Sequence, residues 1–71
     1  MQIEKKFGAR VKELRLKKQV SQEALAYEAG IDRTYMTSVE NGKRNISIQN
    51  IEKILEALGI SFHDFFNKDF K

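Results

Sequence analysis

A stripe of hydrogen-bonding side chains at helical spacing is the part of this sequence best suited to chemistry. Met36 and Val39 are spaced to lie on the inner face of a short helix. Steps of three and four residues place a set without any acid on its outer face: Arg33, Thr34, Thr37, Ser38 and Asn41. A guanidinium fork matches guanine O6 and N7, while a threonine or serine hydroxyl can bond a base edge and a threonine methyl can contact thymine. We therefore predict base contacts from Arg33, Thr34, Thr37 and Ser38, since an ordinary solvated face would usually carry Glu or Lys.

Residues on both sides of this stripe suit the phosphate backbone of DNA. Gln22 begins an earlier predicted helix, where free amides and the positive end of the helix dipole favour an anion. Residues 41–45, NGKRN, form a tight turn with two cations. It is either a plain solvent-exposed turn or, as we predict, a backbone clamp in which Arg44 also reaches a base or a narrow minor groove. The predicted phosphate contacts are Gln22, Asn41, Lys43, Asn45, Ser47 and Asn50. Of these, only Asn41 lies on the stripe.

Two charged residues are better explained by structure than by DNA contact. Glu40 follows Met36 by four residues, which places it on the inner edge of the same helix. Arg15 is one residue past Leu14, on the flank of the first predicted helix. A partly buried Arg15–Glu40 ion pair would account for an acid so close to a DNA-reading face.

Five helices are predicted to position these side chains, and no segment alternates long enough to be a strand. Helical periodicity indicates a first helix at about residues 2–17, and glycines end the second helix at Gly30 and the fourth at Gly59. Four residues are expected to cap the later helices: Ser21, Asp32, Ser47 and Ser61. The fourth helix is expected to face the core with Ile48, Ile51, Ile54, Leu55 and Leu58. The chain is thus predicted to be all-α.

Residues 22–41 fit two helices that cross through a short turn, the helix-turn-helix. Ala26 is small where the second helix of this motif passes over the first, and Gly30 permits the turn. Ile31, Met36 and Val39 would hold the second helix of the motif on the core. This motif lays one helix in the DNA major groove.

Length and composition limit the alternatives. Seventy-one residues make one domain, 1–71, with a net charge of +3 and no cysteine. The single histidine, His63, has no second histidine or cysteine to form a metal site or a nucleophile, so we expect no enzyme, metal, cofactor or small-molecule ligand. There is no apolar membrane span or signal-peptide core, and we expect a cytoplasmic location.

The end of the chain points to self-association. Four of its five phenylalanines lie in the last ten residues: Phe62, Phe65, Phe66 and Phe70. A small core can take one or two of them, so part of residues 47–66 is expected to form a two-fold contact, with Phe62, Phe65 and Phe66 in the dimer interface. The two recognition helices would then lie roughly 34 Å apart on a pseudo-palindromic site.

The segments FGARVKELR, SQEALAYEAGI, SVENGKR and IEKILEALGI resemble the lambda-repressor-like, Cro-type helix-turn-helix family, over nearly the whole chain. The stretch DRTYMTSVENGKRN resembles the controller proteins of restriction–modification systems. The resemblance implies a dimeric regulator that binds operator DNA upstream of its own operon. It implies base reading by Arg33, Thr34 and Thr37, with Tyr35 and Arg44 contacting the DNA nearby. Gln19 stands where many relatives have glycine, so that turn is expected to be longer or strained.

Other roles for the same fold stay open. An antitoxin that neutralises a partner protein and a phage-type repressor are the main alternatives. RNA polymerase is a further candidate partner, although no residue identifies a contact with it. RNA binding is disfavoured, because no exposed aromatic platform accompanies the basic residues.

Overall fold

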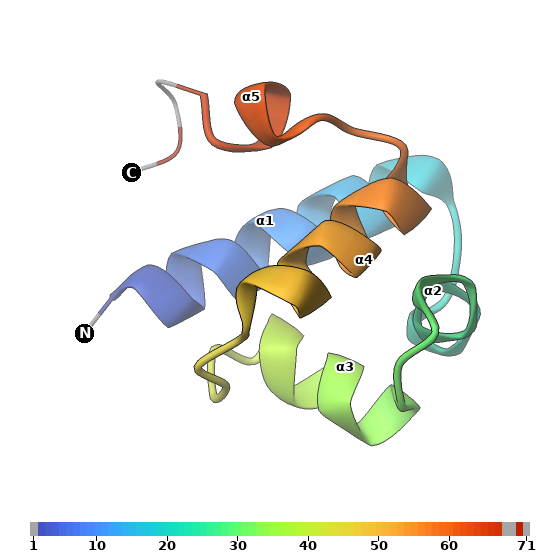
Figure 1. The fold of residues 1–71 in the computed structure, drawn as a ribbon. Helices are drawn as coiled ribbons and strands as arrows, with labels where there is room; N and C mark the ends of the chain where they lie inside the picture. The colour runs from blue at the N-terminus through green and yellow to red at the C-terminus, as the bar shows by residue number, and fades with distance from the viewer. Residues whose placement is uncertain (1, 68–69, 71) are drawn as a thin grey trace.

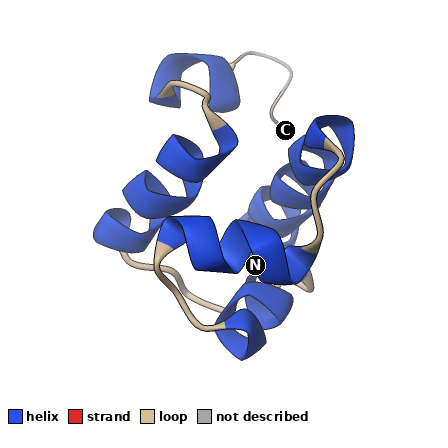
Figure 2. Ribbon diagram, turned by 90° about the vertical axis from the view of Figure 1, so that its right-hand side faces the viewer, coloured by secondary structure: helices blue, strands red, loops and turns tan. Residues whose placement is uncertain are grey.

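A computed structural model describes residues 2–67 and 70 of the chain. Its five helices are α1 (Ile3–Lys18), α2 (Gln22–Ala29), α3 (Arg33–Glu40), α4 (Ile48–Leu58) and α5 (Phe62–Phe65), as labelled in Figure 1. No strand occurs among the described residues, which the colouring of Figure 2 makes plain. The all-α prediction and the helix-turn-helix at 22–41 are confirmed.

The four predicted caps are all in place. The side chains of Ser21, Asp32, Ser47 and Ser61 each accept a hydrogen bond from a backbone amide of the following helix, at 2.8–3.2 Å. Gly30 and Gly59 follow α2 and α4 in the left-handed region, with φ of 73° and 74°. These local signals set where each helix begins and ends.

Gln19 ends α1 in the same left-handed conformation, with φ of 62°. It is the only non-glycine residue with positive φ in the part of the chain that the structure describes. The predicted strain of this turn is therefore present, since a side chain costs about 1 kcal/mol or more in this region.

The core takes residues from all five helices. Its buried members are Phe7, Val11, Leu25, Ala26, Ala29, Met36, Val39, Ile54, Leu55 and Phe65. Gly8 lets α1 approach the end of α3, because a β-carbon at this position would overlap the Val39 carbonyl oxygen. The recognition helix is thus held directly against the longest helix of the fold.

Two predictions about the apolar residues are wrong. Ile48 was expected on the core face of α4, but it is 67% exposed, because it lies in the first turn beyond the edge of the core. Phe65 was expected in a dimer interface, but it is 0% exposed and packs 5.1 Å from Phe7 between ring centroids. Phe65 is therefore a core residue.

Arg10 fastens α5 to the body of the protein. Its guanidinium donates from Nε to the Phe65 carbonyl at 3.3 Å and from Nη2 to the Asp64 carbonyl at 3.1 Å. The two views agree that α5 lies at the end of the molecule away from α3 (Figures 1 and 2).

No helix of the described residues is long and apolar enough to cross a membrane.

Candidate nucleic-acid interface

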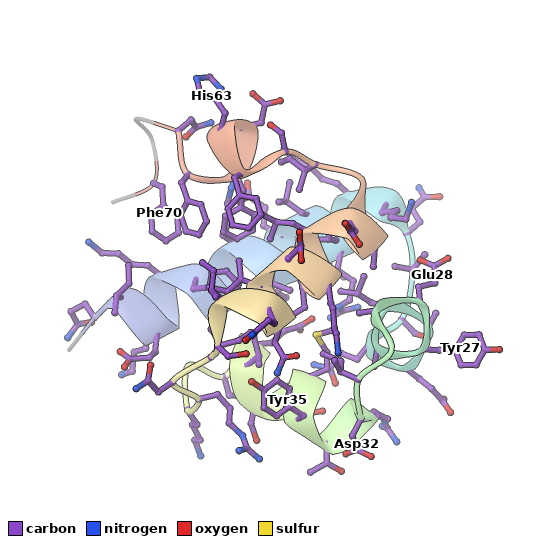
Figure 3. All side chains as sticks on the ribbon, viewed as in Figure 1. Tyr27, Glu28, Asp32, Tyr35, His63 and Phe70 are labelled. Carbon is purple, nitrogen blue, oxygen red and sulfur yellow. The ribbon has the colours of Figure 1, made fainter. Side chains whose placement is uncertain are left out.

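The outer face of α3 presents the predicted base-reading residues. Arg33 and Thr34 are exposed in its first turn, while Thr37 and Ser38 are half-buried one turn later. The helix is capped by Asp32, labelled in Figure 3, whose carboxylate accepts from the Thr34 amide at 2.8 Å. The Asp32 charge is therefore engaged at the start of the helix, and no acid lies on the outer stripe.

Glu40, the acid at the other end of α3, is turned inward. Its Oε2 accepts from Arg15 Nε at 2.7 Å and its Oε1 from Arg15 Nη2 at 3.1 Å. The side chains of Arg15 and Glu40 are only 9% and 1% exposed. Arg15 also donates to the Val20 carbonyl at 2.9 Å, so the guanidinium ties α3 to the turn after α1. The ion pair that the sequence predicts is thus present and buried.

Gln22 links this ion pair to the reading face. Its amide nitrogen donates to Glu40 Oε1 at 3.0 Å, and its amide oxygen accepts from the Thr37 hydroxyl at 2.9 Å. The sequence predicts a phosphate contact for Gln22 and does not predict these two hydrogen bonds. One hydrogen of its amide nitrogen is not required by them, so a phosphate contact stays compatible with the bridge.

Tyr35 joins α3 to α4 and to the loop between them. Its hydroxyl accepts from Asn50 Nδ2 at 3.1 Å, and the Arg44 guanidinium lies over its ring at 4.7 Å from the centroid. Figure 3 shows Tyr35 directed along the α3–α4 side of the molecule. Asn50, predicted to contact phosphate, thus donates a hydrogen bond to Tyr35. The contact with the Tyr35 ring also holds Arg44 beside α3, where Arg44 is predicted to add a DNA contact.

The loop after α3 carries the remaining backbone candidates. Its exposed members are Asn41, Lys43, Arg44, Asn45 and Ser47. The Lys43 amide donates to the Ser38 carbonyl at 2.9 Å. Gly42 has φ of 72°, and a β-carbon there would stand 2.8 Å from the Lys5 Cα. A glycine is needed at this point because the loop both turns left-handed and presses on α1.

The described residues include no group of three His, Cys, Asp or Glu side chains that could hold a metal ion. Cations, amides and hydroxyls make up the surface formed by α3 and its following loop. Such a surface can donate to phosphates and read base edges.

Comparison with known proteins identifies the family of the chain. Residues 11–65 match the family model described as Helix-turn-helix. The chain is 47% identical over 66 residues to the control protein C.MunI of Mycoplasma sp, covering 92% of this chain and 89% of that one. It is 49% identical over 59 residues to the control protein C.BamHI of Bacillus amyloliquefaciens, covering 82% and 73%. The chain belongs to the lambda-repressor-like helix-turn-helix family.

Solved structures of the family share its architecture closely. The controller protein C.AhdI from Aeromonas hydrophila superimposes with a TM-score of 0.85 at 48% identity, over 89% of this chain and 96% of that one. The controller protein C.Esp1396I, solved as a tetramer with its natural 35 base-pair operator, gives 0.86 at 38% identity, over 90% and 84%. The predicted resemblance to restriction–modification controller proteins is confirmed.

Proposed function

We propose that this protein regulates transcription by binding a specific operator as a homodimer, as a controller of a restriction–modification operon. The observation that carries the proposal is the composition of α3. Its outer face offers Arg33 and Thr34 to solvent, while its acid, Glu40, is buried against Arg15. A face with this arrangement suits insertion into the major groove. Controller proteins among the relatives, one of them solved on its operator, support the same role.

Base edges and phosphates are contacted by different residues. Arg33, Thr34, Thr37 and Ser38 read bases from α3, with Arg44 reaching in from the loop. The backbone contacts come from Gln22, Tyr35, Asn41, Lys43, Asn45, Ser47 and Asn50. Phosphate contacts supply most of the affinity and make it depend on salt, while the bases supply the choice of site.

The dimer forms through the surface around α5. Phe62 and Phe66 are 42% and 39% exposed, and their ring centroids lie 6.3 Å apart. Two neighbouring exposed phenylalanines are a costly feature for an isolated monomer of this size. Since α5 lies at the end of the molecule away from α3, a contact made there leaves the reading face free.

Fluorescence anisotropy tests the proposal with labelled DNA from upstream of the protein's own gene and a scrambled duplex as competitor, at about 150 mM salt. A specific regulator prefers its own upstream sequence by about a thousandfold or more. Weak binding that ignores sequence and disappears with added salt would count against it, and would favour a protein partner of the antitoxin kind.

A further inference from the structure

The orientation of the Gln22 amide is set by the buried ion pair. An ionised carboxylate has no hydrogen to donate, and Glu40 is held by two guanidinium N–H groups of Arg15. The Gln22 group that faces Glu40 Oε1 at 3.0 Å must therefore be its nitrogen. The Gln22 oxygen is left facing α3.

That oxygen determines where the Thr37 hydrogen lies. The Thr37 hydroxyl oxygen is 2.9 Å from the Gln22 amide oxygen and 3.1 Å from the Arg33 carbonyl oxygen. Both neighbours are acceptors, and a hydroxyl has only one hydrogen. The hydrogen is therefore directed into the protein, and the hydroxyl of the half-buried Thr37 can offer DNA only a lone pair.

A hydroxyl that can only accept is selective among the bases. In the major groove the donors are the exocyclic amino groups, N6 of adenine and N4 of cytosine. Guanine presents O6 and N7 and thymine presents O4, all of which are acceptors, as are phosphate oxygens. An accepting hydroxyl would face another acceptor at each of these.

We propose that the Glu40–Gln22 chain fixes the Thr37 hydroxyl as an acceptor, so that Thr37 selects a base with an exocyclic amino group, adenine or cytosine. This rests on the proposed function, because it requires α3 to lie in the major groove. Thr37 touches the base, whereas Gln22 and Glu40 act through it as positioning residues.

Selection of binding sites from a random duplex library locates the contact. The wild-type protein and Thr37→Val, which is nearly isosteric, are selected in parallel. The base pair at which the preference is lost in Thr37→Val is the Thr37 position. Thr37→Ser keeps the hydroxyl and is expected to keep the preference. Failure of the wild type to select any sequence would overturn the proposed function along with this inference. Selection by the wild type with an unchanged pattern in Thr37→Val would overturn this inference alone.

Single-group changes in the DNA then identify the group that Thr37 contacts. At an A·T pair, purine in place of adenine removes the amino group and uracil in place of thymine removes the methyl group. At a C·G pair, 2-pyrimidinone in place of cytosine removes the amino group and 7-deazaguanine removes guanine N7. Removal of the amino group is expected to weaken wild-type binding about two- to tenfold, the value of one net hydrogen bond, and to leave Thr37→Val unaffected. Sensitivity only to the methyl group or to N7 would overturn the proposal.

The positioning role of Gln22 has its own readout. Gln22→Met removes the acceptor that faces Thr37 while keeping a side chain of similar length. Its preference for the amino-bearing base over guanine is expected to fall about threefold or more, because the hydroxyl hydrogen is then held by the Arg33 carbonyl alone. A purely structural role would lower stability and leave this preference unchanged, which would overturn the role of Gln22.

Discussion

Gly8 on α1 touches the backbone at the end of the recognition helix, so that a β-carbon on Gly8 would overlap the Val39 carbonyl oxygen and lie 2.8 Å from that of Glu40. These carbonyls are backbone atoms and cannot rotate aside as the end of a flexible side chain could. The close approach of α3 to α1 therefore depends on the absence of a side chain at residue 8.

Gly8→Ala should lower the free energy of unfolding by about 2 kcal/mol or more, through overpacking. The sign of this change distinguishes close packing from helix propensity, because alanine is favoured over glycine inside an ordinary helix by roughly 0.5–1 kcal/mol. Urea denaturation followed by circular dichroism measures the change. The exposed neighbour provides the control, since Ala9→Gly should cost only the helix propensity, about 1 kcal/mol. A Gly8→Ala variant more stable than wild type would contradict the close packing.

Glu40→Ala should cost about 3–5 kcal/mol, because it leaves the Arg15 guanidinium buried without its charge partner. Replacing both residues with methionine should recover much of that loss, since no unpaired charge then stays in the interior. Thermal or urea unfolding measures both variants. Glu13→Ala, which breaks only exposed ion pairs, is the control and should change stability by less than about 1 kcal/mol. A Glu40→Ala variant that melts like wild type would contradict the stabilising role of the buried ion pair.

Tyr35→Ala should weaken operator binding about fivefold, since the loop loses the ring over which Arg44 is held. Tyr35→Phe keeps the ring and removes only the hydroxyl that accepts from Asn50, so its loss should be smaller. Anisotropy titrations compare the two. Equal losses would show that the hydroxyl, through Asn50 or a phosphate, matters more than the ring.

Phe62→Ser combined with Phe66→Ser should make the protein monomeric at micromolar concentration while it stays folded. Both rings are partly exposed, in contrast to Phe65, whose truncation to alanine should cost about 3–5 kcal/mol. Sedimentation velocity measures the association state. Tyr27→Ser removes an aromatic ring that is 86% exposed on α2 and directed into solvent in Figure 3, and should leave the dimer intact. A double variant that sediments as a dimer, or a wild type that is monomeric, would refute this interface.

Much of the site could be predicted because its signals are local. The caps at Ser21, Asp32 and Ser47 need only a hydroxyl or carboxylate three residues or fewer before an amide. The inward side of α3 follows from Met36 and Val39 alone, and it places Glu40 near Arg15.

Other contacts between helices could not be predicted in the same way. Phe65 is the last residue of α5 and Phe66 caps it, and a helix of four residues is too short for periodicity to tell which of the two is buried. Gly8 looks like any glycine in a helix until α3 is placed against it. The Gln22–Glu40 and Asn50–Tyr35 bonds join residues 18 and 15 positions apart, and their partners depend on how the helices cross.

The most direct test of the account compares Arg33→Ala with Lys43→Ala on the selected operator and on a scrambled duplex. Arg33→Ala should lose about 1–3 kcal/mol on the operator, keep its scrambled-DNA affinity, and lose discrimination at one base pair. Lys43→Ala should weaken both duplexes alike and lower the salt dependence by about one counterion. Full operator preference in Arg33→Ala would contradict base reading by α3.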